Sequence, residues 1–459
     1  MPANHSSMVS SEQETTNNQL FIPPLIDTRK EGTSIFLKMQ RGQKEFFKGT
    51  SSATFGYNGN YLGPTIRAYN NQDIQLTTVN QIGEATSIHK HGLHVPGSVD
   101  GGPKQRIEPG ESRTDLLKIR QQASTNWYHP HLMGSTAEHV FKGLAGIFIV
   151  EDENSESLNL PSQYGINDIP LIVQDRQFID NVMTYNNVMG GMHNTGGMHH
   201  TSGYMGNTIM VNGTVAAQKS VPPAWVRLRI LNGSNARFYN FSFEDNHTFH
   251  VIATEGGFLN HPVEVKNLEV WPGERFEVML DFSDIDRITL NASSSNGSGS
   301  LFKVIEFITD ANIQSDGTLP SQLNEIIPYD LEEAKKTRKF SLQTGPVIGG
   351  MMGINGYAMD LSIINEMIPL HQLERWVIRS EDFGNHPFHI HGASFQILSM
   401  NGSAVPPQEQ GWKDVLKVVQ QSEVLIRFSH PADSKAPYVY HCHILEHEDR
   451  GMMGQFTVE

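Results

Sequence analysis

Short stretches in which apolar and polar residues alternate recur along the whole chain and predict β-strands. Residues 225–231 and 276–282 alternate as expected for a strand with one buried face, whereas residues 143–150 form the apolar run of a fully buried strand. Turns rich in Gly, Asn, Ser and Pro separate these stretches, and long segments with helical periodicity are scarce. The pattern predicts an all-β protein, with further strands at residues 35–37, 74–79, 169–173, 426–428 and 455–458.

Polar segments divide this series of strands into three predicted domains. The 459 residues are enough for about three domains at roughly 150 residues each. Residues 1–20 are polar and predicted to be disordered, and the polar residues 151–166 and 311–336 are predicted linkers. The predicted domains span residues 21–150, 167–310 and 337–459, and the second contains a loop rich in Met and His at residues 183–210.

Charge and hydropathy restrict the partners and the location. A net charge of −15 argues against nucleic acid or an anionic membrane as a partner. No apolar run is long enough to span a bilayer, and the first 20 residues lack the apolar core of a signal peptide. We expect a monomer that is periplasmic or secreted and whose export signal has been removed; a cytoplasmic protein is the alternative.

The candidate chemistry is concentrated in residues 440–453, which read YHCHILEHEDRGMM. On a strand, the two histidines that flank Cys442 face one side and Cys442 faces the other. Cys442, His447 and Met452 supply three of the four ligands of a blue copper site, which are a thiolate, two imidazoles and a distant thioether. Cys442 is the only cysteine, and a buried structural thiol is the alternative interpretation. The crowding of soft ligands favours copper.

Four H-x-H pairs form an internal repeat. The pair at residues 89–91 corresponds to the pair at 389–391, and the pair at 129–131 corresponds to the pair at 441–443. The middle domain keeps only the scaffold of the repeat, because Ile252 stands where a histidine is expected. One such pair is weak support for a metal site, whereas four pairs matched by a repeat are strong support.

His386, three residues before His389, is the candidate for the missing imidazole of the Cys442 site. Imidazole alone suits copper, zinc and iron. Imidazole combined with a thiolate and a distant Met favours copper.

These motifs resemble the four copper-binding signatures of the multicopper oxidases. The signatures are H-K-H-G at residues 89–92, W-Y-H-P-H at 127–131, H-P-F-H-I-H-G at 386–392 and H-C-H-I-L-E-H-E-D-R-G-M-M at 441–453. The resemblance covers the chain from about residue 35 to its end. It is strongest to bacterial copper efflux oxidases and bacterial laccases, through residues 228–233, 411–414 and 447–449.

The resemblance implies three cupredoxin-like Greek-key β-barrels, with a trinuclear copper cluster between the first and the third. It implies four copper ions and assigns their ligands by position. It places Cys442, His386, His447 and, axially, Met452 at the type 1 copper, His89 and His389 at the type 2 copper, and His91, His129, His131, His391, His441 and His443 at the type 3 pair.

The resemblance also implies the reaction. Substrate would reduce the type 1 copper, electrons would pass through Cys442 to the cluster, and oxygen would be reduced by four electrons to water. This reduction consumes protons, and nearby carboxylic acids are natural relays. Asp100 and Glu448 match family positions for that role, and the alternative for each is a carboxylate that only orients a copper-bound histidine.

The reducing substrate is less well defined. Residues 189–205 are rich in Gly and carry thioethers and imidazoles, and thioethers select Cu(I). The segment lacks apolar periodicity, so we interpret it as copper-binding, with flexible filler or an expanded surface loop as the alternatives. The candidate ligands in it are Met189, Met192, Met198 and His199.

The third domain departs from the efflux-oxidase pattern. Those proteins usually carry a Met-rich insert there, where this chain keeps only Met351 and Met352. Asp382 matches an Asp of the family's substrate-copper site, but Gly384 stands where a Met is expected. Asp360 is a further candidate acidic ligand.

The sequence thus predicts a multicopper oxidase that reduces oxygen to water, with Cu(I) as the best-supported substrate, oxidised for copper tolerance. The alternatives are a laccase that oxidises phenols and aromatic amines, and a copper-binding protein without turnover. A two-domain copper nitrite reductase is more remote, because it would not need four H-x-H pairs. Lys90 stands where the family commonly has Trp, and the sequence does not define what this changes at the type 2 copper.

Overall fold

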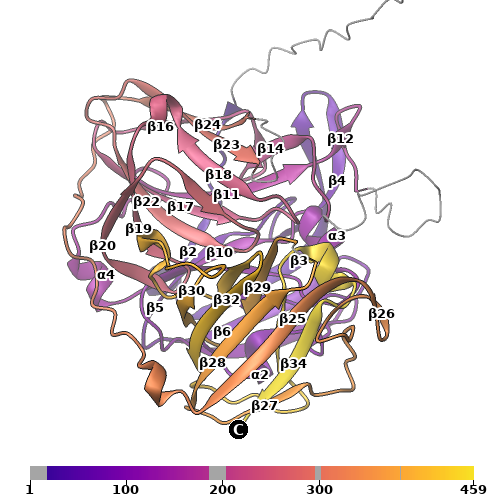
Figure 1. Cartoon of the computed structure of the whole chain (residues 1–459). Helices are drawn as coiled ribbons and strands as arrows, with labels where there is room; N and C mark the ends of the chain where they lie inside the picture. Colours follow the sequence, from indigo (N-terminus) through magenta and orange to yellow (C-terminus); the bar gives the residue numbers. More distant parts are fainter. Residues whose placement is uncertain (1–17, 186–202, 295–300, 383) are drawn as a thin grey trace, which may run out of the picture.

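The computed structural model describes residues 18–185, 203–294, 301–382 and 384–459. Its strands form three pairs of β-sheets, one pair within each predicted domain, and a two-stranded sheet of β12 (Phe178–Ile179) and β13 (Val182–Met183). In Figure 1 the middle pair (pink) lies above the third pair (orange to yellow), and the first pair (indigo to purple) lies behind them. The predicted all-β fold is confirmed, whereas the exact domain boundaries stay predictions.

The first domain has one four-stranded and one five-stranded sheet, which enclose an apolar core that includes Leu37, Leu76 and Phe148. The sheet orders are β4-β3-β6-β8 (Thr50–Tyr57, Ser34–Phe47, Asp73–Gln81, Ser112–Lys118) and β2-β5-β10-β9-β7 (Leu25–Asp27, Thr65–Tyr69, Gly146–Glu151, Ser124–His129, His89–His91).

The middle domain has one seven-stranded and one six-stranded sheet around a core that includes Leu171, Phe241 and Val278. The sheet orders are β15-β14-β11-β17-β22-β19-β20 (Thr214–Val215, Thr208–Val211, Asp168–Arg176, Trp225–Asn232, Arg275–Asp281, Phe249–Thr254, Gly257–Val265) and β1-β16-β24-β23-β18-β21 (Asn18–Gln19, Ala217–Val221, Leu301–Thr309, Arg287–Ser294, Tyr239–Phe243, Leu268–Val270).

The third domain has two five-stranded sheets around a core that includes Phe340, Trp376 and Phe456. Neighbouring strands are rarely consecutive in the chain, so connections cross between sheets as in Greek-key barrels. The sheet orders are β26-β25-β28-β32-β30 (Gly350–Ile354, Lys336–Val347, Leu373–Ser380, Gln421–Arg427, Phe395–Ser399) and β27-β34-β33-β29-β31 (Glu366–Ile368, Met453–Val458, Tyr438–Cys442, His386–Ile390, Val415–Val418).

The two strands predicted to have one buried face, β17 and β22, are buried almost throughout. Their polar side chains pair with each other, since Arg227 Nε donates to Glu277 Oε2 at 2.7 Å and Arg229 Nη1 donates to Glu277 Oε1 at 3.0 Å. Arg229 also donates to the Thr125 hydroxyl of the first domain at 2.9 Å. The alternation therefore marks a domain interface rather than a solvent-exposed face.

Residues 18–20, predicted as the end of the disordered segment, are ordered. β1 pairs in parallel with Ala217 and Gln218 of β16, and Leu20 is buried in the middle-domain core. Backbone hydrogen bonds to a distant strand order this stretch, and its polar composition gives no sign of them. Residues 1–17 lie outside the described part of the chain.

The helices are short and lie in the connections. In the described part of the chain, none is long and apolar enough to cross a membrane. α3 packs against α5 where the first and third domains meet. The α-helices are α1 (Thr28–Glu31), α2 (Gly97–Asp100), α3 (Thr136–Phe141), α4 (Glu153–Ser157) and α5 (Leu445–Asp449), and the 3₁₀ turns are η2 (Glu244–Asn246), η3 (Leu331–Glu333) and η4 (Pro407–Glu409).

Candidate metal centre

Cys442, at the end of β33, forms a buried group with His386 at the start of β29 and His447 in α5. Its sulphur lies 3.5 Å from Nδ1 of His386 and 3.5 Å from Nδ1 of His447. Met452 is buried in the same core, and its carbonyl accepts the Cys442 N–H at 3.1 Å. Burial raises the pKa of the Cys442 thiol, and a coordinated metal ion would deprotonate it. The group fits the thiolate, two imidazoles and thioether of a type 1 copper site.

Two pairs of strands present the H-x-H histidines. β29 pairs with β33 so that His389 lies opposite His441, and β7 pairs with β9 so that His89 lies opposite His129. Directly opposed residues of antiparallel strands share a face, so His389 and His441 point to the same side. Because side chains alternate along β33, Cys442 points to the other side.

Eight buried imidazoles meet where the first and third domains face each other. The Nε2 atoms of His131, His391 and His441 lie 3.0 to 3.3 Å from one another. Two further contacts join the domains by ring stacking. His89 stacks on His391 with 3.8 Å between ring centroids, His91 stacks on His389 at 3.7 Å, and His129 and His443 complete the set.

The nitrogens of this cluster have the properties of metal ligands. Burial, with repulsion between neighbouring imidazoles, lowers the pKa of six of these histidines well below the ordinary value, so their rings are neutral and offer a lone pair. Buried polar atoms without a partner are rare in proteins. Within the described residues, the cluster nitrogens without a hydrogen-bond partner are Nε2 of His89, Nδ1 of His91, Nε2 of His129, Nδ1 of His131, Nε2 of His389 and both nitrogens of His443.

Asp100, at the end of α2, joins two histidines of the cluster. Its Oδ2 accepts a hydrogen bond from Nδ1 of His391 at 2.8 Å, and its backbone carbonyl accepts one from Nδ1 of His89 at 3.0 Å. These bonds leave Nε2 of each ring free for a metal ion. Asp100 thus fixes one histidine from each of two domains.

Glu448, in α5, occupies the equivalent place on the other side of the cluster. Its carboxylate oxygens lie 3.2 Å from Nδ1 of His131 and 3.2 Å from Nδ1 of His441. Burial, reinforced by the charge of Asp449, raises the pKa of Glu448 well above its ordinary value. A carboxyl group in this position can hold a proton beside the cluster.

Asp414, to which the sequence analysis assigned no role, also holds two of these histidines. Its Oδ1 accepts a hydrogen bond from Nε2 of His91 at 3.0 Å, and its backbone carbonyl accepts one from Nδ1 of His389 at 2.7 Å. Such partners fix the ring orientation of a metal ligand. The sequence feature that could have indicated this role of Asp414 is the match of residues 411–414 to the family pattern.

The multicopper oxidase family matches three regions of the chain, residues 38–155, 180–305 and 329–459. The chain belongs to the multicopper oxidase family. Its buried clusters match a type 1 copper site and a trinuclear site of type 2 and type 3 copper. The predicted cofactor, four copper ions, therefore has a complete set of candidate ligands in this multicopper oxidase.

Similar proteins cover almost the whole of this multicopper oxidase. The cell division protein FtsP of Dickeya dadantii is 35% identical over 457 residues, which are 96% of this chain and 93% of FtsP. The multicopper oxidase mco of Staphylococcus aureus is 34% identical over 450 residues, with 96% and 92% covered. The solved structure of a bacterial laccase-like multi-copper oxidase CueO from Ochrobactrum sp. has a TM-score of 0.88 and 36% identity, and covers 96% of this chain and 100% of that chain.

Asp382 connects the type 1 site with the surface of this multicopper oxidase. Its Oδ1 accepts a hydrogen bond from Nε2 of His386 at 3.1 Å, and the backbone N–H groups of Thr344 and Gly384 also donate to its carboxylate. Although burial favours the protonated form, these bonds hold the pKa of Asp382 well below its ordinary range. Its side chain is 22% exposed, so a substrate at the surface can contact a partner of a copper ligand.

The other candidate substrate ligands that the structure describes are Met351, Met352 and Asp360. Met351 is 57% exposed, whereas Met352 is buried in the third-domain core, and the role of both as substrate ligands stays a prediction. Side chains alternate along β26, so two adjacent methionines cannot share one face. The exposed carboxylate of Asp360 accepts from Ser362. Four predicted ligands, Met189, Met192, Met198 and His199, lie outside the described residues.

Lys90, the departure from the family pattern, points away from the cluster. It lies between His89 and His91 on β7, so its side chain takes the opposite face of the strand. It is buried there, and its ammonium donates to Asp115 Oδ2 at 2.5 Å. Lys90, which stands where the family commonly has Trp, therefore forms a buried ion pair with Asp115 behind His89 and His91. It does not offer a ligand.

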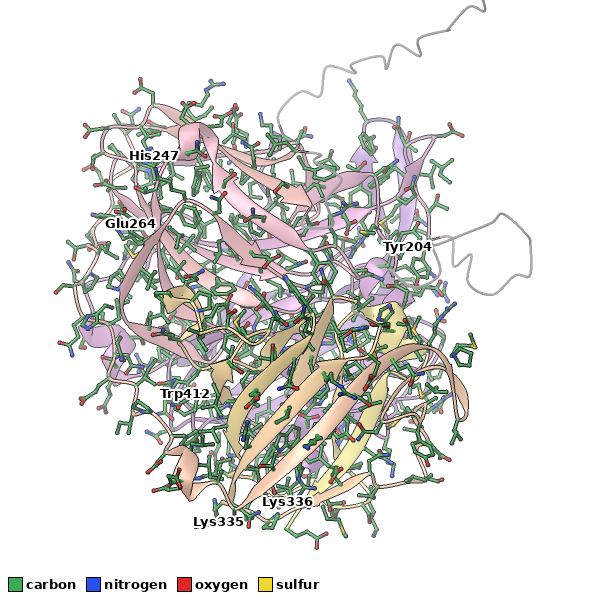
Figure 2. The ribbon with its side chains drawn as sticks, viewed as in Figure 1. Tyr204, His247, Glu264, Lys335, Lys336 and Trp412 are labelled. Atoms are coloured by element: carbon green, nitrogen blue, oxygen red, sulfur yellow. The ribbon has the colours of Figure 1, made fainter. Side chains whose placement is uncertain are left out.

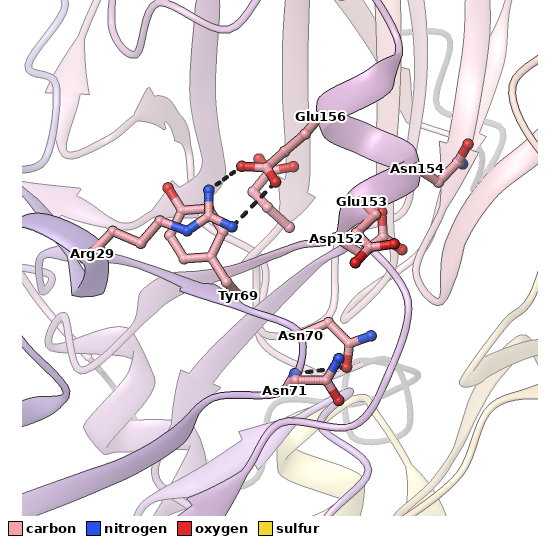
Figure 3. A pocket seen from close by; sticks show the side chains of 9 residues that line it. Arg29, Tyr69, Asn70, Asn71, Asp152, Glu153, Asn154 and Glu156 are labelled. Atoms are coloured by element: carbon pink, nitrogen blue, oxygen red, sulfur yellow. Dashed lines mark hydrogen bonds and ion pairs between the residues drawn. The ribbon is translucent and has the colours of Figure 1, made fainter.

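A separate polar cavity of about 420 Å³ lies on the first domain (Figure 3). The guanidinium of Arg29 occupies it, 3.5 Å from the Tyr69 ring centroid and paired with Glu156. None of its lining residues is a candidate copper ligand. This cavity is not part of the metal centre.

Proposed function

We propose that this multicopper oxidase couples the oxidation of Cu(I) to Cu(II) to the four-electron reduction of oxygen to water, as a copper-tolerance enzyme of the periplasm or the cell exterior. The observation that carries the choice of substrate is the anchoring of the Met- and His-rich segment beside the type 1 site. Soft thioether donors select Cu(I), and the described residues on both sides of this segment contact the residue before His447, a type 1 ligand.

Both described ends of that segment contact Glu446, the residue before His447. The Tyr185 hydroxyl donates to Glu446 Oε1 at 3.1 Å, and the Tyr204 backbone N–H donates to Oε2 at 3.0 Å. Tyr204 is labelled in Figure 2. The two tyrosine rings also contact each other, with 4.9 Å between centroids. The described residues on both sides of the segment therefore lie beside α5, and this supports delivery of copper to the type 1 site.

The chain's own residues provide the path for electrons and protons. Bound copper supplies the one-electron redox chemistry and the site where oxygen reacts. Cys442 is joined by single peptide units to His441 and His443 of the cluster, at about 3.3 Å per residue. Glu448 can hold a proton against His131 and His441, and Asp100 keeps His391 in place on the other side.

A laccase that oxidises phenols and aromatic amines is the second candidate function. The hairpin of β25 and β26, which is linked to Asp382 through Thr344, exposes Ile348 and Met351, and Tyr357 next to it is 54% exposed. Such an apolar rim can contact an aromatic ring. The solved relative from Ochrobactrum sp. is described as an oxidase of lignin model compounds.

Oxygen uptake by the copper-loaded protein separates these functions. With Cu(I) as the only reductant we expect fast oxygen uptake, because the Met- and His-rich segment supplies this substrate. With hydroquinone as the reductant we expect oxygen uptake only when copper is added. Fast hydroquinone turnover without added copper, together with feeble Cu(I) turnover, would instead identify a laccase. A loaded protein that consumes no oxygen with either reductant would be a copper-binding protein.

Replacing Met189, Met192, Met198 and His199 with serine should lower kcat/KM for Cu(I) by roughly 10-fold or more, because soft ligands are lost. The value for hydroquinone should change less than about twofold, since the type 1 site is untouched. The measurement is steady-state oxygen uptake over a range of each reductant. A Met367→Ser variant, which removes a 75% exposed methionine elsewhere, is the matched control. Equal losses for both reductants would contradict a role in copper delivery.

A further inference from the structure

Arg275, at the start of β22 in the middle domain, is fully buried and contacts both neighbouring domains. Its Nη1 donates to Asp414 Oδ1 at 2.7 Å and its Nη2 donates to Asp414 Oδ2 at 2.6 Å, so it binds this third-domain carboxylate in a bidentate manner. Its Nε donates to the carbonyl of Thr125 in β9 of the first domain at 2.9 Å. One guanidinium thus joins all three domains.

The Asp414 that Arg275 holds is the residue that contacts His91 and His389. A bidentate Arg–carboxylate pair has a fixed planar geometry, so Arg275 sets the direction of the Asp414 carboxylate. That direction places Oδ1 at 3.0 Å from Nε2 of His91 and leaves Nδ1 of His91 free in the cluster. The His91 ring stacks on His389 with an interplanar angle of 11°, so fixing one ring also restricts the other.

Gly92 makes room for this contact, and Gly273 makes room for the ring of His443. A Cβ atom on Gly92, which has φ +90°, would lie 2.5 Å from Nη2 of Arg275 and 3.0 Å from Oδ2 of Asp414. A Cβ atom on Gly273, which has φ +84°, would lie 2.8 Å from the His443 ring. The middle domain therefore packs directly against the copper-site histidines.

We propose that Arg275 is a positioning residue of the trinuclear copper site, through which the middle domain, which contributes none of the eight histidines of that site, holds His91 and His389 in their ligating orientation. It acts through Asp414 and touches no reacting atom. Loss of a hydrogen-bond partner of a metal ligand costs roughly 10- to 100-fold in metal affinity. We expect that loss at the trinuclear site, where His91 would hold type 3 copper and His389 type 2 copper, and not at the type 1 copper, because Cys442 and its partners belong to a separate group.

An Arg275→Lys variant tests this, with Arg229→Lys as the matched control. Lysine keeps the charge but loses the planar fork. Arg229 is an equally buried middle-domain residue, donates to Asp168 at 2.7 and 3.2 Å, and contacts Thr125 of the same strand β9. Its side-chain partners are Asp168, Glu277, Glu151 and Thr125, none of which is a copper ligand.

The measurement is made on fully copper-loaded proteins. A chelator is titrated in while the trinuclear site is followed by the copper that the protein retains and by the type 2 signal in electron paramagnetic resonance, and the type 1 site by its blue absorption. We expect Arg275→Lys to lose the type 2 signal at roughly 10- to 100-fold lower chelator concentration with the blue absorption retained, and Arg229→Lys to behave as the wild type. Equal losses in both variants, or a loss in neither, would overturn the proposal.

Wild-type protein gives a second measurement that needs no folded variant. Coupling between two sites is reciprocal, so removal of the type 2 copper should loosen the contact of Arg275. Hydrogen exchange of residues 271–277 should rise on removal of that copper, whereas exchange of residues 226–231, which surround Arg229, should stay unchanged. Unchanged exchange at residues 271–277 would also overturn the proposal.

Discussion

A Cys442→Ser variant is expected to lose the blue absorption of the type 1 copper completely. Cys442 is the only thiol of the chain and the common partner of His386 and His447, both 3.5 Å from its sulphur. Without a thiolate, the group would lose its sulphur ligand, and with it the path from bound copper through the Cys442 side chain to the backbone that leads to His441 and His443. Oxygen uptake should fall by more than about 100-fold, since losing a ligand costs more than losing a partner of a ligand.

The copper content of this variant and its type 2 resonance signal are the internal controls. Three of the four predicted copper ions should remain, because the eight imidazoles of the cluster come from strands that Cys442→Ser leaves intact. An unchanged visible spectrum, or oxygen uptake near the wild-type rate with Cu(I), would contradict the assignment of Cys442.

A Glu448→Gln variant is expected to lower oxygen uptake by roughly 10²- to 10⁴-fold, the usual contribution of a positioned acid or base. Glu448 lies 3.2 Å from both His131 and His441, and glutamine keeps its shape but cannot deliver a proton. Because electrons still enter at Cys442, anaerobic reductant should bleach the blue absorption at the wild-type rate. Recolouring after admission of oxygen should be slow, which stopped-flow absorption can measure.

Two outcomes would contradict the relay. Slow anaerobic bleaching would mean that Glu448 acts on electron entry, and loss of type 3 copper from the purified variant would mean that it only orients His131 and His441. Glu374→Gln is the matched control, because Glu374 is a fully buried third-domain carboxylate paired with Arg338 at 2.6 Å. We expect that control to lose stability while the rate of recolouring stays unchanged.

The local spacing of residues determined the ligand types and much of the fold. The H-x-H pairs on β7 and β29 and the H-C-H triplet on β33 follow from strand alternation, which any sequence with this spacing obeys. Cys442, His447 and Met452 lie within one short stretch, so their meeting required only the end of β33 and the short helix α5. The alternating stretches likewise predicted strands that the structure contains.

Contacts between distant residues were decided by the tertiary structure alone. The match of Asp382 to a family position could not show that its carboxylate holds Nε2 of His386, and no periodicity shows that β1 joins a sheet formed some 200 residues later. The burial of Met352 follows from the face of β26 that packs on the third-domain core, which the motif-based prediction did not consider.

The sequence by itself determined which side chains are available to bind copper, because ligand chemistry and strand spacing are local properties. Only the tertiary structure decided how those side chains are held. His131 meets His391 across 260 residues of chain, and Arg275 meets Asp414 across 139. Such contacts depend on the packing of whole domains, in which buried polar groups must find partners. That requirement brought Arg275 of the middle domain to the histidines of the trinuclear site.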